Sequence, residues 1–287
     1  MLRTLYRTLS PRWQALFLDY PVDLRPRKTP DQPGWGAVAA AIEARRSDIE
    51  AWVDCLSARA SALQEIRPEG QETEAAAPRW NNGFLPGLDM AALHTVLAER
   101  RPRRYVEVGS GNSTKLAAWT ARREGFQMDI TSVDPFPRAE VDGLVDHAVR
   151  TPFEAVDEGV WRQLEAGDVL FVDNSHRSLP NSDVTALFME VLPALPAGVL
   201  VHIHDVYLPW DYPQDMCDRG YNEQYLLAVA IAAAPERYRP MLPAFWVSEQ
   251  ADLAARLEGI WAHPNTSGVE RHGGSFWLEL GPVSAPQ

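Results

Sequence analysis

The stretch that decides the fold is Tyr105–Thr114, which reads YVEVGSGNST. A short apolar strand runs here into a glycine turn and then into a helix that is predicted to start at Ser113. Gly109 and Gly111 lack a Cβ atom, so the backbone can turn tightly and approach a ligand closely, and the free N–H groups of the helix face that ligand. The stretch therefore predicts a site for a nucleotide-like ligand.

The carboxylate of Glu107 indicates which ligand this is. It lies two residues before the first glycine, and it suits a cationic amino-acid ligand better than a pyrophosphate. A dinucleotide fingerprint would need a third small residue where this chain has Thr114. A phosphate loop would need Gly-Lys-Ser/Thr at its end, whereas Lys115 follows Ser113 and Thr114 here.

Together, four motifs in order resemble the class I S-adenosylmethionine-dependent methyltransferases over roughly Trp80 to Leu280. The similarity is greatest to a bacterial branch with the pattern E-V-G-S-G-x-S-T, then an aspartate closing the second strand, then D-x-S-H, then a strand that ends in an acid. The residues that carry this resemblance are Glu107 to Thr114, Asp134, Asp173 to His176, and His204-Asp205.

The cofactor implied by the resemblance is S-adenosylmethionine, with Glu107 holding the methionine amino group directly or through water. Asp173 would lie near the cofactor carboxylate, and Phe153 beside the adenine. Independently, Asp134 lies 23 residues after Gly111 (134 − 111) at a predicted strand end, close to the roughly 20 residues at which an acid reaches ribose hydroxyls. The predicted cofactor-binding residues are Glu107, Gly109, Gly111, Asn112, Ser113, Asp134, Phe153 and Asp173.

For catalysis, His176 is the predicted general base, because histidine titrates near neutral pH and this one follows a strand-end aspartate by three residues. The resemblance to metal-dependent sugar O-methyltransferases, whose D-G-S-H histidine has this role, implies the same for His176. The alternative is a histidine that only hydrogen-bonds the loop. His204 and Asp205 at the next strand end are the other predicted catalytic residues, whereas His202 is expected to be a core residue.

A divalent metal is a further implication of that resemblance, with Asp173 and Asp205 as its ligands. In this chain, however, His204 stands where the first acid of a pair would be, and Asn174 replaces the glycine. Mg²⁺ prefers oxygen ligands, so the loss of a carboxylate weakens the case for magnesium. A histidine suits manganese, iron or zinc better.

Composition excludes several classes of protein. The 287 residues carry a formal net charge of −12. A surface with this charge repels phosphate backbones, so a small molecule is expected as the substrate rather than a nucleic acid. The basic run 100–104 is expected to be solvated. Cys55 and Cys217 lie far apart and predict neither a disulfide framework nor a zinc site, which fits a reducing cytoplasm. No apolar run approaches the roughly 20 residues that a membrane span needs.

Two regions are expected along the chain. Residues 1–80 form an N-terminal helical appendage with proline-rich linkers, in which 1–20 is an amphipathic helix rather than a secretory signal and 35–66 is one long helix or two. This appendage is expected to cover the cleft, to mediate homo-oligomerisation or to extend the core. Residues 81–287 form the cofactor domain, an α/β, doubly wound, Rossmann-like and mostly parallel seven-stranded sheet.

The predicted strands lie at 104–108, 128–133, 147–150, 168–172, 198–203, 238–245 and 275–280, with helices at 88–100, 113–123, 183–192 and 222–234. The loop 207–221 is aromatic and is expected either to be a substrate lid or to pack on the N-terminal helices. The predicted function is transfer of a methyl group to a hydroxyl or amine of a sugar or secondary metabolite. The alternatives are S-adenosylmethionine chemistry that releases methylthioadenosine, such as an intramolecular cyclisation, and a non-catalytic cofactor-binding protein.

Overall fold

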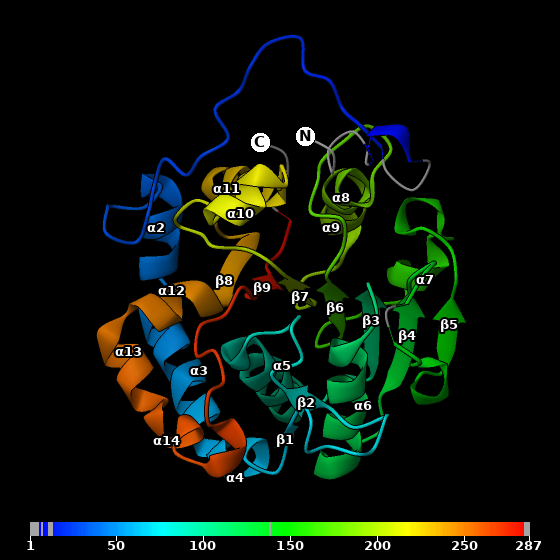
Figure 1. Cartoon of the computed structure of the whole chain (residues 1–287), viewed down its shortest axis with the longest axis vertical. Coiled ribbons are helices and arrows are strands. Elements are labelled where there is room, and N and C mark those ends of the chain that lie inside the picture. Colours follow the sequence, from blue (N-terminus) through cyan, green and yellow to red (C-terminus); the bar gives the residue numbers. More distant parts are fainter. Residues whose placement is uncertain (1–5, 7, 11–13, 138, 284–287) are drawn as a thin grey trace.

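A seven-stranded sheet forms the middle layer of the molecule (Figure 1). The computed structural model describes residues 6, 8–10, 14–137 and 139–283. The strand order is β5-β4-β3-β6-β7-β9-β8, and β9 runs antiparallel to both of its neighbours, β7 and β8. The α/β prediction is therefore confirmed. The strands are β3 (Arg104–Val108), β4 (Asp129–Val133), β5 (His147–Val149), β6 (Val169–Val172), β7 (Leu200–Ile203), β8 (Tyr238–Pro243) and β9 (Phe276–Leu280).

The register of the central strands brings three polar loops together. Strands β6 and β7 are buried at every residue, as expected where helices cover both faces of a parallel sheet. Val108 pairs with Val172, which in turn pairs with Ile203. Because these residues end β3, β6 and β7, the residues that follow them, Gly109, Asp173 and His204, lie side by side at the carboxyl edge of the sheet.

Helices cover both faces of this sheet, with α3, α5 and α6 on one side and α8, α9 and α11 on the other (Figure 1). A separate parallel pair joins β1 (Arg67–Pro68) to β2 (Arg79–Trp80). The helices are α2 (Gly36–Glu43), α3 (Arg46–Ala58), α4 (Ala60–Leu63), α5 (Gly87–Arg100), α6 (Asn112–Glu124), α7 (Gly159–Arg162), α8 (Asp183–Ala186), α9 (Leu192–Ala194), α10 (Gln214–Asp218), α11 (Glu223–Ala233), α12 (Ala244–Glu249), α13 (Ala251–Arg256) and α14 (Glu258–Trp261).

The N-terminal region packs on the rest of the chain. The predicted helical stretch 35–66 is divided into α2, α3 and α4, with breaks at Ala44–Arg45 and at Arg59. The break lets α2 contact α11 and β8 while α3 contacts β8 and α5. Ile42, Ile49 and Val53 are fully buried in the same apolar cluster as the strands, so these helices extend the core.

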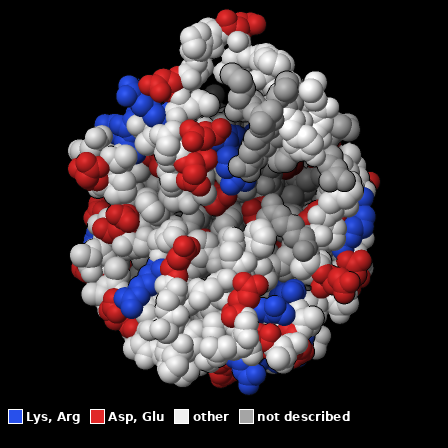
Figure 2. All heavy atoms as spheres, viewed as in Figure 1, with Lys and Arg blue, Asp and Glu red and all other residues white. Residues whose placement is uncertain are grey.

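Of the amphipathic helix expected over residues 1–20, residues 1–5, 7 and 11–13 lie outside the described residues, while 6, 8 and 9 are helical. Residues 14–20, which the structure does describe, are not helical. Within the described ranges, no helix combines the length and the apolar character that crossing a membrane requires. Figure 2 shows acidic and basic side chains interspersed over the viewed face, without a broad basic area.

Candidate active site

Two large cavities open at the carboxyl edge of the sheet, and Asp173 lines both of them. The first cavity, of about 710 Å³, lies over the ends of β3 and β4 and includes Asp134 and Phe153. The second, of about 790 Å³, lies over the end of β7 and includes His176 and His204. Asp173 directly follows β6 between them, so a group bound in one cavity meets a group bound in the other at this residue.

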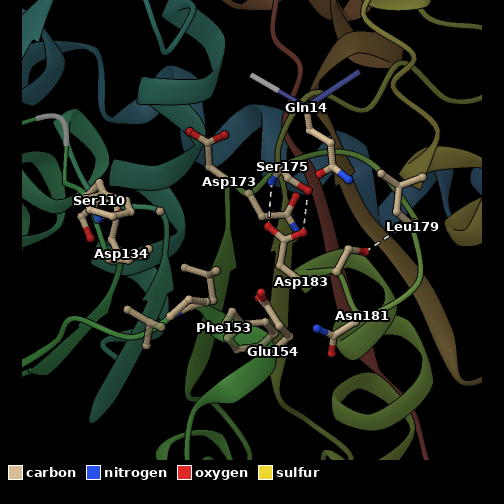
Figure 3. Close-up of a pocket in the computed structure, with 18 of the residues that line it drawn as sticks. Gln14, Ser110, Asp134, Phe153, Glu154, Asp173, Ser175, Leu179, Asn181 and Asp183 are labelled. Atoms are coloured by element: carbon tan, nitrogen blue, oxygen red, sulfur yellow. Dashed lines mark hydrogen bonds between the residues drawn. The ribbon is translucent and has the colours of Figure 1, made fainter. Parts of the chain in front are cut away.

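Asp134 stands on one wall of the first cavity beside Ser110, opposite Asn181 and Asp183, with Phe153 and Glu154 below them (Figure 3). Its Oδ2 accepts a hydrogen bond of 2.8 Å from the backbone N–H of Ser110, and its Oδ1 accepts one of 2.8 Å from that of Phe136. These two bonds fix the carboxylate against the glycine turn. The predicted ribose residue is therefore positioned at the cavity wall.

The glycine turn packs directly against the loop after β6. Gly109 has φ +84°, and a Cβ built there would lie 1.9 Å from the carbonyl oxygen of Asp173. A Cβ on Gly111, in contrast, would have nothing within 4 Å. Gly111, Asn112 and Ser113 line a small space of about 40 Å³ that also reaches Asp173. The contact at Gly109 thus leaves no room for a side chain, whereas the space beside Gly111 is open.

Glu107 lies beneath this turn and lines none of these three spaces. Its side chain is fully buried, with one carboxylate oxygen bonded to the hydroxyl of Thr114 and the other accepting a 3.1 Å hydrogen bond from the hydroxyl of Tyr105. Burial raises the pKa of Glu107 to about 7, against the effect of its hydroxyl donors. In the structure, this residue ties β3 to the first turn of α6.

The second cavity has a ring of alternating carboxylates and imidazoles at its base. Nε2 of His176 lies 3.3 Å from Oδ1 of Asp173 and 3.4 Å from Oδ2 of Asp205. Nδ1 of His204 lies 3.6 Å and 3.5 Å from the same two carboxylates. The structure thus brings the three predicted catalytic residues together with Asp173. We call these four residues the Asp–His ring.

Two members of the ring have strained backbones. His176 has φ 61° and Asp205 has φ 55°, values in the left-handed region that non-glycine residues seldom adopt. The backbone carbonyl of His176 accepts a hydrogen bond from Asn222 N–H just before α11, which holds the loop in place. Such strain persists where the surroundings determine the conformation, and it concentrates at functional sites.

Two further carboxylates lie behind the ring, each on the outer nitrogen of one imidazole. Glu223 contacts Nδ1 of His176, and Oδ2 of Asp89 lies 3.0 Å from Nε2 of His204. Both acids are fully buried. Although burial opposes a positive charge, Glu223 and Asp173 raise the pKa of His176 to about 10, and Asp205 and Asp173 raise the pKa of His204.

Sequence reasoning did not find these two acids. Asp89 and Glu223 stand in the first turns of α5 and α11, where an acid ordinarily stabilises the helix dipole, so their positions suggest no other role. The backbone N–H groups of Gly274 and Ser275 donate to Asp89 from a segment 185 residues away. Only the tertiary fold brings these groups together.

His202 has the structural role expected of it. Its ring stacks on Phe171 with centroids 3.8 Å apart, and its Nε2 lies 2.7 Å from the hydroxyl oxygen of Ser275. Burial lowers the pKa of His202 well below its usual value, so the ring is neutral. This histidine supports the sheet beneath His204.

The aromatic loop 207–221 forms one wall of the second cavity through Tyr207, Met216 and Tyr221. It also contacts the N-terminal segment, since the backbone N–H groups of Arg27 and Lys28 donate to Oδ2 of Asp211 at 2.7 and 2.9 Å. The loop therefore lines the second cavity and contacts the linker before α2, and its role as a substrate lid stays a prediction.

The side chains do not fit the metal site that the resemblance implies. Across the part of the chain that the structure describes, no group of three or more His, Cys, Asp or Glu side chains is arranged to hold a metal ion. All four ring nitrogens of His176 and His204 already face carboxylates. The metal assignment of Asp173 and Asp205 is therefore not supported.

Comparison with known proteins identifies the domain. Residues 106–206 match a family model described as a methyltransferase domain. This part of the chain is similar to a methyltransferase domain. This match spans the glycine turn, Asp134 and the Asp–His ring, and it indicates an S-adenosylmethionine-dependent methyltransferase. The first cavity is accordingly the candidate S-adenosylmethionine site.

Two solved structures show similarity to this chain. One is the branched-chain polyamine synthase from Thermus thermophilus, with 13% identity, a TM-score of 0.40 and coverage of 81% of this chain. This chain spans 65% of that protein's length, just under two thirds. The other is a putative methyltransferase from Thermobifida fusca YX, with 14% identity, a TM-score of 0.32 and coverage of 69% of this chain and 85% of that one. No curated protein matches the sequence.

Proposed function

We propose that the chain transfers the methyl group of S-adenosylmethionine, bound in the first cavity, to a hydroxyl or amine of a small molecule bound in the second cavity. The observation that carries the proposal is the meeting of the two cavities at Asp173, with His176 in contact with it. Methyl transfer from a sulfonium is an in-line displacement, so donor and acceptor must approach from opposite sides of one point.

On the cofactor side, Asp134 and Ser110 would bind the ribose, and Phe153 would lie against the adenine. The glycine turn leaves backbone N–H groups of Asn112 and Ser113 at the helix start, where the methionine carboxylate is favoured. Asp173 would face the methionine end of the cofactor. Glu107 holds the turn from below and acts on the cofactor through α6.

On the acceptor side, His176 would remove the proton of the attacking group. In the ligand-free site this imidazole is held protonated by its carboxylate neighbours. A sulfonium bound beside Asp173 brings a second positive charge to the same carboxylates, which disfavours the imidazolium and lowers the pKa of His176 toward neutrality. Glu223 would keep Nδ1 protonated so that Nε2 faces the acceptor, and His204 and Asp205 would position the ring.

The test combines cofactor binding with product analysis. His176→Ala should slow methyl transfer by 10²-fold or more, the scale for general-base catalysis, while S-adenosylmethionine affinity measured by titration calorimetry stays near that of the wild type. Asp134→Ala is the matched control and should weaken binding by about 1.5 to 3 kcal/mol, the range for hydrogen bonds to charged groups.

Three results would contradict the proposal. Equal loss of cofactor binding in the two variants would overturn the assignment of His176. Release of methylthioadenosine instead of S-adenosylhomocysteine, detected by mass spectrometry, would show the alternative sulfonium chemistry. Tight binding without turnover, unaffected by His176→Ala, would show a non-catalytic cofactor-binding protein.

A further inference from the structure

The second cavity is rich in carboxylates. Four of them line it, namely Asp173, Asp205, Asp215 and Glu270, and the fully buried Asp89 and Glu223 lie directly behind its imidazoles. Its volume of about 790 Å³ lies within the roughly 300–1,000 Å³ typical of small-molecule sites. The charges on this wall therefore act on whatever small molecule the cavity accepts.

Positive groups in the wall do not balance these acids. The lining contains one guanidinium, Arg219, whose carbon lies 4.3 Å from the ring centroid of Tyr221. With all three lining imidazoles of His176, His204 and His272 protonated, the six carboxylates would still outnumber the cations by two. Solvent and salt partly screen the exposed side chains, which are Asp215, Arg219 and Glu270. The excess negative charge therefore acts most strongly at the Asp–His ring.

Glu223 adds a buried acid behind the second cavity. Its side chain is fully buried, and its Oε2 has no hydrogen-bond partner among the residues that the structure describes. Buried polar atoms are nearly always paired with protein or water, because leaving one unpaired is costly. Here the unpaired atom is an acceptor behind His176 and outside the cavity lining, so it adds negative charge next to the Asp–His ring.

We propose that the acceptor in the second cavity is a cationic amine, bound as an alkylammonium against Asp173 and Asp205. This inference rests on the proposed function and names its substrate class. An ammonium supplies the positive charge that this wall lacks, and its N–H groups can donate to the two carboxylates. A neutral hydroxyl compound would bring no charge, and a phosphorylated acceptor would be repelled.

The reaction balances with this acceptor. The ammonium gives one proton to His176, and the resulting amine lone pair attacks the methyl carbon of the sulfonium. The N–C bond forms as the C–S bond breaks, with its electron pair staying on sulfur. The products are an N-methyl ammonium and the neutral thioether S-adenosylhomocysteine.

The test uses the full chain, S-adenosylmethionine and two acceptors with the same four-carbon chain, a diaminoalkane and the corresponding diol. Methyl transfer to the diamine should exceed transfer to the diol at least tenfold, measured as S-adenosylhomocysteine released and as N-methyl product by mass spectrometry. Asp215→Asn combined with Glu270→Gln should raise KM for the diamine about tenfold, equivalent to about 1.4 kcal/mol, with kcat nearly unchanged. Asp218→Asn, on the same helix as Asp215 but outside the cavity lining, is the control for net charge and should leave KM unchanged.

Several outcomes separate this inference from the proposed function. If the chain does not bind S-adenosylmethionine in calorimetry, the proposed function itself fails. If it binds the cofactor and methylates the diol in preference to the diamine, only the amine inference is overturned. It is also overturned if Zn²⁺ or Mn²⁺ alone binds stoichiometrically and prevents diamine binding, because the carboxylates would then serve a metal.

Discussion

Replacing Gly109 by alanine should destabilise the protein by about 2 to 3 kcal/mol or more. A non-glycine residue in the left-handed region costs roughly 1–2 kcal/mol, and Gly109 has φ +84°. The new Cβ would also lie 1.9 Å from the carbonyl oxygen of Asp173, so β3 and the loop after β6 must separate by more than 1 Å. That movement strains the 2.9 Å hydrogen bond from Asp173 N–H to Val108, worth about 1 kcal/mol.

Gly111→Ala is the matched control for this prediction. A Cβ there meets nothing within 4 Å, and φ of 168° is extended backbone that any residue adopts, so the free energy of unfolding should change by less than about 0.5 kcal/mol. Urea denaturation followed by tryptophan fluorescence measures both variants, and calorimetry measures their affinity for S-adenosylmethionine. A Gly109→Ala midpoint equal to that of the wild type would refute the packing argument.

Three further predictions concern titration. Burial lowers the pKa of His94 from 6.5 to about 4, so the unfolded chain binds more protons than the folded chain between these pH values. The free energy of unfolding should therefore fall by up to about 3 kcal/mol as the pH falls from 6.5 to 4. Urea denaturation midpoints across that pH range measure this loss, which should be absent in His94→Asn. Burial raises the pKa of Glu107 from 4.5 to about 7, so the folded chain binds more protons than the unfolded chain between these pH values. The free energy of unfolding should therefore fall by up to about 3 kcal/mol as the pH rises from 4.5 to 7. Glu107→Gln should remove this pH dependence, and a pH dependence like that of the wild type would contradict the assignment. Glu223→Gln removes a carboxylate that raises the pKa of His176. The apparent pKa of the general base in the pH profile of kcat should therefore shift to lower pH, and kcat should be about tenfold lower. An unshifted profile would show that Glu223 only supports the fold.

Local sequence signals predicted the part of the site that follows individual strands. The apolar run before Gly109 predicted β3 with the same bounds, and Pro135 after a β-rich run placed Asp134 at the end of β4. These signals act within a few residues, so one sequence is enough to find them. The three strand-end groups at Gly109, Asp173 and His204 could be placed together for the same reason, since parallel strands share one carboxyl edge.

Long-range features could not be predicted in this way. The break after α2 depends on where β8 and α11 present apolar surface, which no pattern within residues 35–66 reveals. Helices α12 to α14 between β8 and β9 were missed, and so was the insertion of β9 between β7 and β8. Glu223 and Asp89 belong to the same class, because each meets its histidine only through tertiary contacts between segments 47 and 115 residues apart.

The two cavities must be tested with residues that line only one of them, because Asp173 lines both. Its N–H bonds to β3, its carbonyl oxygen packs against Gly109, and its carboxylate faces both imidazoles of the Asp–His ring. A substitution at Asp173 would therefore alter the glycine turn, the cofactor cavity and the acceptor cavity together, and a loss of activity would assign it to none of them. Asp134 lines only the first cavity and Asp215 only the second, so a change in KM for the acceptor without a change in cofactor affinity can come from Asp215 but not from Asp173.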